Sequence, residues 1–210
     1  MPITINGSGT VTGISAGGLP DASVNTEDLN AGTASAGQKL VASGASGAMS
    51  WGSSIVSGTA QNSTSGTAID FTGIPSWVKR VTVMFSGVST SGTSNPIVQL
   101  GASGGLTTSG YLGAVISSAV SPAAANMSSG FTFGTSGSSV ATNLRHGIMT
   151  IANLSGNSWC CGGTVGYSDV AVVGLIGGAV SLSGTLTQIR ITTTNGTDTF
   201  DAGSINIIYE

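Results

Sequence analysis

The chain has 210 residues, of which 34 are glycine and only 6% are Asp, Glu, Lys or Arg, where an ordinary globular domain carries about 25% charged residues. The net charge of −3 and the small number of basic residues exclude a surface that neutralises a run of phosphates. We therefore expect no nucleic-acid partner. The same shortage of cations argues against docking to an anionic membrane.

The apolar content favours a folded chain over a disordered one. Hydrophobic residues make up 40% of the sequence and the mean hydropathy is +0.35, whereas disorder accompanies low hydrophobicity and high net charge. Val, Ile and Ala occur in short runs that suit strands. The sequence therefore predicts an all-β protein whose surface polarity comes from hydroxyl and amide groups.

The chain divides into two regions, residues 1–55 and 56–210. Hydrophobic residues in the first are sparse and separated by Gly and Ser, so this segment cannot close a core alone. We interpret it as an extended attachment and stalk segment, and a flexible linker is the alternative. No secretory signal is evident at the start, and the apolar window 170–180 is too short for a membrane span. We interpret that window as a buried pair of strands, and expect synthesis in a cytoplasm and no membrane insertion.

The sequence of the second region predicts a series of short strands. The alternation is clearest in residues 80–85, where one face carries Val81, Val83 and Phe85 and the other carries Arg80, Thr82 and Met84. The turn Asn195-Gly196 predicts a hairpin, and residues 123–128 are the only stretch compatible with a helix. These features predict a β-sandwich, jelly-roll-like, with further strands at 97–100, 111–117, 130–133, 147–152, 158–167, 170–175, 185–194 and 204–209.

Candidate catalytic groups are few. Asp198 and Asp201 could form the carboxylate pair of a glycan hydrolase, but they lie in a turn-rich segment where Asp commonly bonds nearby backbone. His146 is the single histidine and has no cluster around it that would form a zinc site or a triad. We interpret it as a hydrogen-bonded residue at the start of a strand. The sequence predicts no catalytic residue, no cofactor and no metal, and hence no enzyme.

The two cysteines, Cys160 and Cys161, are adjacent. Neighbouring residues of a strand point to opposite faces, so a bond between them would be strained. We expect reduced, packed thiols, with pairing between chains as the alternative.

Three stretches resemble bacteriophage tail-fibre proteins. Residues 3–21, ITINGSGTVTGISAGGLPD, are similar to the start of many short tail proteins. Residues 37–41 and 47–51, GQKLV and GAMSW, resemble an element of phage fibre stalks. The last and most specific pair, 71–85 (FTGIPSWVKRVTVMF) with 195–210 (NGTDTFDAGSINIIYE), looks like the two ends of a C-terminal domain of phage tail proteins.

The resemblance implies a homotrimeric virion fibre, made in the host bacterial cytoplasm and located in the phage tail. Residues 1–55 would attach to a tail or baseplate protein, and residues 56–210 would form a head that faces the host cell surface. The family pattern carries no catalytic residues to transfer. The alternatives are a non-adhesive virion component, such as a head fibre, decoration protein or baseplate adaptor, and a glycan hydrolase or lyase.

The interpretation as a tail fibre assigns roles to individual residues. Tyr111 and Tyr167 adjoin turns rich in Gly and Ser, so we expect them on a surface that binds host polysaccharide or protein. Trp77, beside the turn at Pro75, is interpreted as a core residue. Sparse apolar residues of the first region would meet sister chains around the threefold axis: Ile3, Ile5, Leu40, Val41 and Trp51.

Overall fold

The computed structural model describes residues 39–43, 48–52, 55–118, 124–134 and 139–210. The chain divides into two compact units, Met1–Ser54 and Ile55–Glu210. The boundary expected between residues 55 and 56 lies beside this division.

The first unit contains a two-stranded antiparallel sheet of β1 (Lys39–Ser43) and β2 (Ala48–Gly52). Leu40 stands opposite Trp51, and both are half-buried, whereas Val41 is exposed. An exposed Val41 and a partly covered Trp51 leave apolar surface for a neighbouring chain, but the stalk role of these residues stays a prediction. Ile3 and Ile5 lie outside the described residues.

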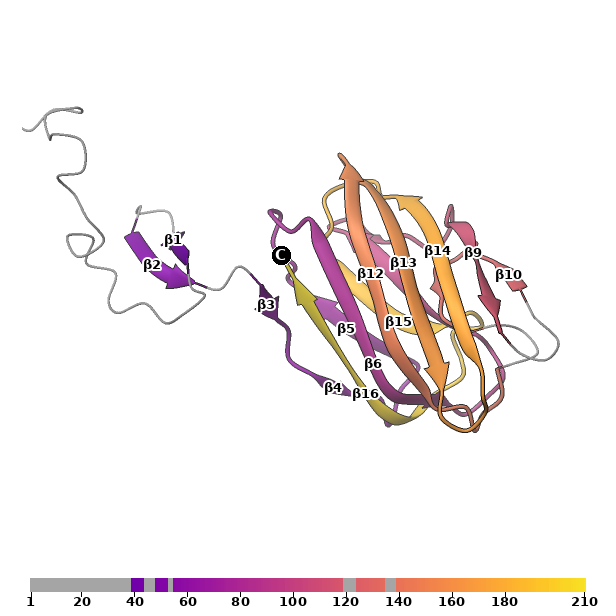
Figure 1. Ribbon diagram of the computed structural model, residues 1–210. Helices are drawn as coiled ribbons and strands as arrows, with labels where there is room; N and C mark the ends of the chain where they lie inside the picture. The colour runs from indigo at the N-terminus through magenta and orange to yellow at the C-terminus, as the bar shows by residue number, and fades with distance from the viewer. Residues whose placement is uncertain (1–38, 44–47, 53–54, 119–123, 135–138) are drawn as a thin grey trace, which may run out of the picture. The chain divides into compact units, whose positions relative to one another are not determined.

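The second unit consists of two antiparallel sheets that share one hydrophobic core. Figure 1 shows the larger sheet in front and the smaller one behind it. In spatial order the nine-stranded sheet comprises β10 (Ala124–Asn126), β9 (Leu112–Ser117), β14 (Val173–Ser181), β13 (Ser158–Tyr167), β12 (Arg145–Ser155), β6 (Arg80–Thr90), β16 (Phe200–Tyr209) and β3 (Val56–Ser57), with β4 (Gln61–Asn62) also on β16. The five-stranded sheet comprises β11 (Phe131–Thr132), β7 (Pro96–Ala102), β15 (Gln188–Thr193) and β5 (Ala68–Thr72), with β8 (Gly105–Leu106) on β7.

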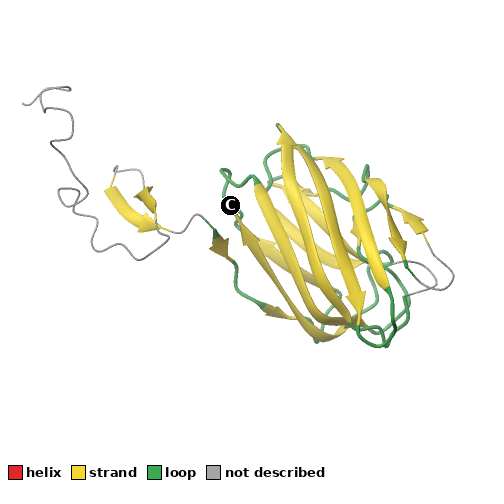
Figure 2. Ribbon diagram, viewed as in Figure 1, coloured by secondary structure: helices red, strands yellow, loops and turns green. Residues whose placement is uncertain are grey.

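The described part of the chain contains strands, turns and loops but no helix (Figure 2). This confirms the all-β prediction. Strands β12, β13 and β14 follow one another in sequence and in space, so the larger sheet is built around a meander. No described helix has the length and apolar character needed to cross a bilayer.

Alternating burial explains how these segments become strands around a core. In β6 the side chains of Val81, Val83 and Phe85 are buried, as the alternation predicts. On the neighbouring β16, Ile205 and Ile207 are buried in the same core. Burial of each such side chain stabilises the fold by about 1.5–3 kcal/mol.

Three local predictions are wrong. Residues 124–126 form the edge strand β10 rather than a helix, because their backbone pairs with β9. The apolar window 170–180 holds one strand, β14, whose alternate side chains are exposed, rather than a buried pair. The Asn195-Gly196 turn is not a hairpin, because β15 belongs to the smaller sheet and β16 to the larger one. Here the chain crosses from one sheet to the other.

A bulge shapes the crossing end of β16. The register between β16 and β6 shifts between Ala202 and Ser204, and Gly203 has a φ of 92°. A Cβ at Gly203 would collide with the carbonyl group of Gly87 on β6. Glycine is therefore required where the two strands approach most closely.

Candidate functional site

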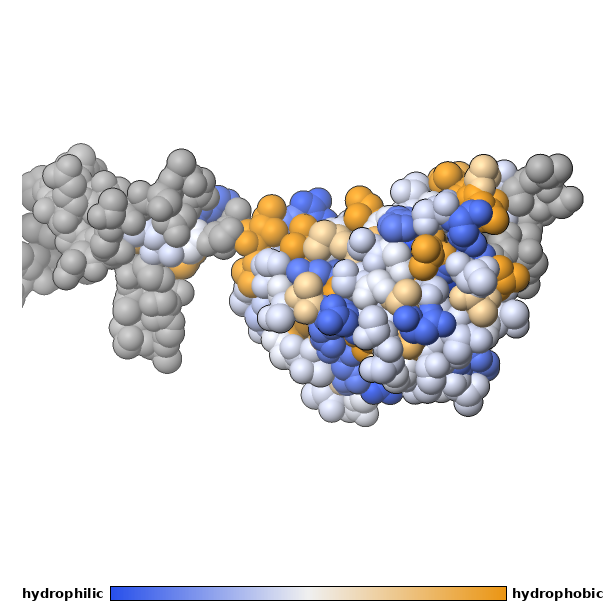
Figure 3. Space-filling model, turned by 90° about the horizontal axis from the view of Figure 1, so that it is seen from below, coloured by the Kyte–Doolittle hydropathy of each residue, from blue (hydrophilic) through white to orange (hydrophobic). Residues whose placement is uncertain are grey.

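The lower end of the second unit is polar without being highly charged. Figure 3, which views it from its lower end, is coloured mostly in the near-white tones of intermediate hydropathy, with scattered hydrophilic and hydrophobic patches. Such tones are those of Gly, Ser and Thr. A ligand would therefore meet mostly hydroxyl and backbone groups at this end, and any binding site must be sought in the few places that offer more.

Tyr111 and Tyr167 do not form such a place, because both side chains are buried. Tyr111 is 1% exposed, and its hydroxyl accepts a hydrogen bond from the Leu100 backbone N–H at 2.7 Å. Burial raises the pKa of Tyr111 to about 12. Tyr167 is 8% exposed and lies beneath the guanidinium of Arg145, 5.5 Å from its ring centroid. The prediction that these tyrosines face a receptor is wrong.

The alternation of residues in the sequence indicates that Tyr167 is buried. Tyr167 shares its strand parity with Trp159, Cys161 and Val165, all of which are buried, and alternate residues of a strand share a face. For Tyr111 the pattern is ambiguous, because apolar residues occupy both parities of β9.

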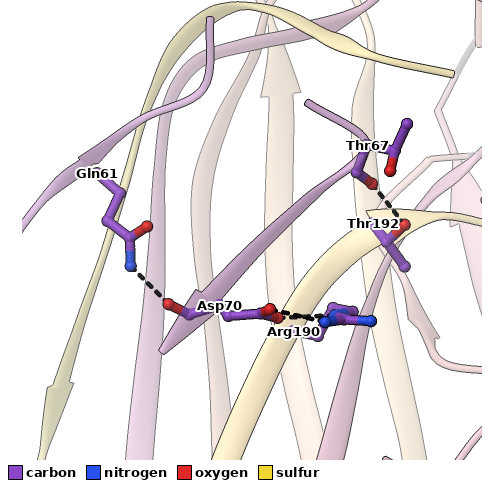
Figure 4. Close-up of polar contacts among 5 residues, drawn as sticks. All are labelled: Gln61, Thr67, Asp70, Arg190 and Thr192. Atoms are coloured by element: carbon purple, nitrogen blue, oxygen red, sulfur yellow. Dashed lines mark hydrogen bonds and ion pairs between the residues drawn. The ribbon is translucent and has the colours of Figure 1, made fainter. Parts of the chain in front are cut away.

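The outer face of the five-stranded sheet carries the most concentrated set of polar side chains. Arg190 on the central strand β15 stands opposite Asp70 on β5 and opposite Gln99 on β7. Its Nε donates to Asp70 Oδ1 and its Nη2 to Asp70 Oδ2, both at 2.7 Å (Figure 4). The hydrogen bond to Asp70 raises the pKa of Arg190. The pair remains partly open to solvent, with the two side chains 38% and 40% exposed, and no bond to Arg190 Nη1 is found among the described residues.

A hollow of about 340 Å³ lies on the Arg190 side of this pair. Thr192 Oγ1 donates to the Thr67 carbonyl at 2.7 Å, and Gln99 Nε2 donates to the Ser129 carbonyl at 2.8 Å. These bonds fix the walls of the hollow and leave the Gln99 amide oxygen as an acceptor.

A second hollow, of about 270 Å³, lies on the Asp70 side. Gln61 Nε2 donates to the Asp70 backbone carbonyl at 2.7 Å (Figure 4), and Thr72 and Tyr209 also line this hollow. We use the name polar strip for the side chains along both hollows: Gln61, Asp70, Thr72, Gln99, Arg190 and Thr192.

An aromatic pair adjoins the strip. Trp77 is 54% exposed, and its ring lies 5.9 Å from that of Tyr209 at an interplanar angle of 49°. Tyr209 therefore connects Trp77 to the second hollow. The interpretation of Trp77 as a core residue is wrong, because the turn at Pro75 places the indole outside the sandwich, where it packs on one neighbour. Among the described aromatics it presents the largest open face.

Asp198 and Asp201 hold loops together. Asp198 Oδ2 accepts from the Ser94 backbone N–H at 2.9 Å, and its Oδ1 accepts from Asn195 Nδ2 at 2.7 Å. Asn195 Oδ1 in turn accepts from the backbone of Thr197 and Asp198, which closes the turn. Asp201 accepts from the Ser89 hydroxyl. Asp198 thus belongs to the turn, as the turn-rich sequence predicts, whereas Asp201 lies on β16 and bonds across to a side chain of β6.

His146 bridges two segments at the start of β12. Its Nδ1 accepts from the Gly87 backbone N–H at 3.1 Å, and its Nε2 lies 3.2 Å from the Ser168 hydroxyl. Because Nδ1 is the acceptor, the ring proton resides on Nε2 and is donated to Ser168. This confirms the hydrogen-bonded histidine. The described residues contain no group of three or more His, Cys, Asp or Glu side chains arranged to hold a metal ion.

Cys160 and Cys161 are both free thiols, and they lie on opposite faces of β13. Cys161 is buried, and burial raises its pKa to about 12. Cys160 points outward and is half-buried. Only Cys160 is therefore available to react in the folded chain.

Arg145 is completely buried, which the sequence does not predict. Its Nη1 donates to the Asn143 carbonyl and its Nη2 to the Ser139 hydroxyl, each at 3.3 Å, while Nε has no hydrogen-bond partner. Burial lowers the pKa of Arg145. The side chain anchors the segment before β12 to the core, and no pattern in the sequence distinguishes it from a surface arginine.

Together these features define a class: an all-β protein whose main unit pairs two antiparallel sheets and carries a polar strip beside an exposed tryptophan. Comparison with known proteins found no match among family models, curated proteins or solved structures.

Proposed function

We propose that this chain is a structural protein of a bacteriophage virion, a homotrimeric tail fibre that recognises the host cell surface. Residues 1–55 attach the fibre to a tail or baseplate protein, and residues 56–210 form the head. The three stretches that resemble phage fibre sequences support this proposal, as does the division of the chain into two units.

The observation that carries the adhesive role is the polar strip beside Trp77. Saccharides present hydroxyl groups around rings with apolar faces, so sites for them combine hydrogen-bonding side chains with an aromatic platform. The strip supplies the Asp70–Arg190 pair and the amides of Gln61 and Gln99. The exposed indole of Trp77 supplies the platform. We propose that a cell-surface polysaccharide binds along this surface.

Binding without hydrolysis fits the strip better than cleavage does. Glycosidases use a pair of carboxyl groups on either side of the scissile bond. Asp70 is the single carboxylate of the strip, and both its oxygens accept from Arg190. Weak contacts in each of three heads would still give firm attachment through avidity.

The test is binding of the full chain to an array of immobilised bacterial surface polysaccharides. We expect the wild type to bind at least one of them, and Trp77→Ala to weaken that binding by about tenfold, which corresponds to about 1.4 kcal/mol. Leu154→Ala is the matched control, because Leu154 is 72% exposed and lies outside the strip. Absence of binding to the whole array, or equal binding by all variants, would refute the adhesive role.

The burial of Tyr111 and Tyr167 favours the alternative of a non-adhesive virion component, because it removes the aromatic surface first expected to meet a receptor. Immunogold imaging of the particle separates the two. Label at the tail tip supports the fibre, and label on the capsid supports a head fibre or decoration protein.

A further inference from the structure

The outer face of the nine-stranded sheet carries large apolar side chains in the open. Leu112 is 71% exposed, Leu175 57%, Ile148 51%, and Ile116 and Val173 47% each. They project from β9, β14 and β12, which lie in the same sheet in Figure 1. Single exposed apolar residues are ordinary, but a contiguous set marks an interaction surface.

The strand register places these side chains in rows across the sheet. One row runs through Ile116, Leu175, Thr164, Ile148 and Met84, each directly opposite the next. A second row lies two residues further along each strand and has smaller side chains: Ala114, Gly177, Gly162, Thr150 and Thr82. A third row runs through Leu112, Ala179, Cys160 and Ala152. We call these three rows, together with Val173, the apolar face.

The three rows carry no Asp, Glu, Lys or Arg; one charged side chain, Arg80, stands opposite Ala152 on β6 at the margin of the third row, where it pairs with Glu210. Two such surfaces can therefore come together without stripping water from ions, which is the main cost of burying a polar interface. The absence of charge also removes repulsion between identical copies, which would otherwise present the same charges to each other.

The face also carries a projection and a recess on the same strand. Leu112 projects at one end of β9. At the other end, a hollow of about 300 Å³ is lined by Ile116, Ser117, Ser118, Val173 and Leu175. Four residues of strand separate Leu112 from Ile116, or about 13 Å. Leu112 of one copy can thus fill the recess of a neighbouring copy, while the recess of the first copy receives a Leu112 in the same way. Symmetric assemblies require such self-complementary surfaces.

The size of the face suits a contact at the lower end of specific interfaces. Five strands spaced about 4.8 Å apart, along about six residues of about 3.3 Å each, cover roughly 475 Å². Two copies would bury roughly 950 Å², close to the roughly 1,000 Å² that marks a specific interface.

We propose that the apolar face packs against another copy of this chain, so that the second unit itself, and not only the stalk, holds the oligomer together. The partner on the face is another copy within the proposed trimeric fibre. The number of copies in this inference therefore rests on the proposed function. The polar strip lies on the five-stranded sheet except for Gln61 on β4, and β4 is not part of the apolar face, so assembly through the face leaves the strip available.

The experiment measures the mass of the full chain by light scattering over a range of concentrations. Leu175→Lys places a charge in the first row of the face, beside the recess, and Leu154→Lys places the same charge on a more exposed leucine at the hairpin end of β12. We expect Leu175→Lys to raise the concentration needed for assembly by at least about tenfold and Leu154→Lys to leave it unchanged. Wild-type assembly that persists equally in Leu175→Lys, or a wild type that is monomeric, overturns the proposal.

Cys160 supplies an independent readout, because it lies in the third row whereas Cys161 is buried with a raised pKa. A maleimide should label Cys160 slowly in the assembled wild type and rapidly in Leu175→Lys. Equally rapid labelling in both would contradict the proposal. Circular dichroism checks that Leu175→Lys is folded, and Leu112→Lys replaces it if it is not.

The outcomes separate the two proposals. A dimer that dissociates on Leu175→Lys supports the face and contradicts the trimeric fibre. Loss of polysaccharide binding with assembly intact contradicts the adhesive role and leaves the face untouched.

Discussion

The outer faces of the two sheets differ in the side chains that they expose. The smaller sheet gathers Asp70, Arg190 and amide groups into one strip, where the ions satisfy each other and remain open to water. The larger sheet carries no charge on its apolar face and exposes Leu112, Ile148 and Leu175 instead. Under the two proposals, the first face remains in contact with solvent and ligand, whereas the second is covered by another copy.

Two of the arginines in the sheets, Arg145 and Arg190, give the largest contrast. Arg145 is completely buried in β12, and Arg190 is exposed on β15. We expect Arg145→Ala to lower the free energy of unfolding by about 3 kcal/mol, because it empties a core position and releases the Ser139 and Asn143 contacts. Chemical denaturation measures the change. A loss below about 1 kcal/mol would mean that the buried cation contributes little to the fold.

Alkaline pH should weaken the core that lies between the two faces. The pKa values of Tyr111 and Cys161 are each raised to about 12 in the fold, so the unfolded chain releases these protons first. The stability that Cys161 contributes is present below about pH 9, and that of Tyr111 below about pH 10. Each is lost as the pH rises from there towards 12, by about 1.4 kcal/mol per pH unit. Denaturation midpoints at pH 8, 10 and 11 measure this decline. In Tyr111→Phe the decline above pH 10 should be shallower, and an unchanged slope would contradict the assignment.

A glycine of the apolar face offers a more selective change. A Cβ at Gly177 meets nothing within 4 Å, so Gly177→Val should leave the unfolding free energy within about 0.5 kcal/mol of wild type. The added side chain fills the shallow row, so association should weaken about tenfold. Light scattering and thermal denaturation together test both statements.

Gly163 on the neighbouring strand is the matched control. A Cβ there would collide with the backbone of Ile148 and Met149, so Gly163→Ala should lower stability. If Gly177→Val destabilised the fold as much as Gly163→Ala, the open space over Gly177 would be disproved.

The smallest effect belongs to the polar strip. Arg190→Gln removes a bidentate ion pair that is open to solvent, and such pairs contribute about 0–1 kcal/mol. We expect a stability change below about 1 kcal/mol but a loss of polysaccharide binding of about tenfold. A large loss of stability with binding unchanged would reverse the roles given to the two faces.

Local pattern was sufficient for the strands but not for their partners. The alternation of Val81, Val83 and Phe85 predicts β6 correctly, and the expected strand 158–167 coincides with β13. Asn195-Gly196 is a true turn, with Gly196 at a φ of 69°. A turn, however, does not specify which strand the chain pairs with next, and Phe200 enters the other sheet.

The candidate site was harder to predict, because exposure depends on the fold as a whole. Trp77 and Tyr167 both adjoin turn residues in sequence, yet one is 54% and the other 8% exposed. The parity of β13 could have identified Tyr167 as buried. The Asp70–Arg190 pair joins residues far apart in the chain, and only the register of β5 with β15 brings them together.

The solution mass of the full chain tests the central claim of an assembled fibre most directly. We predict three times the chain mass of 20.4 kDa, with the apolar face covered and Cys160 protected. A compact monomer of 20.4 kDa at every concentration would contradict both the fibre and the role given to the larger sheet.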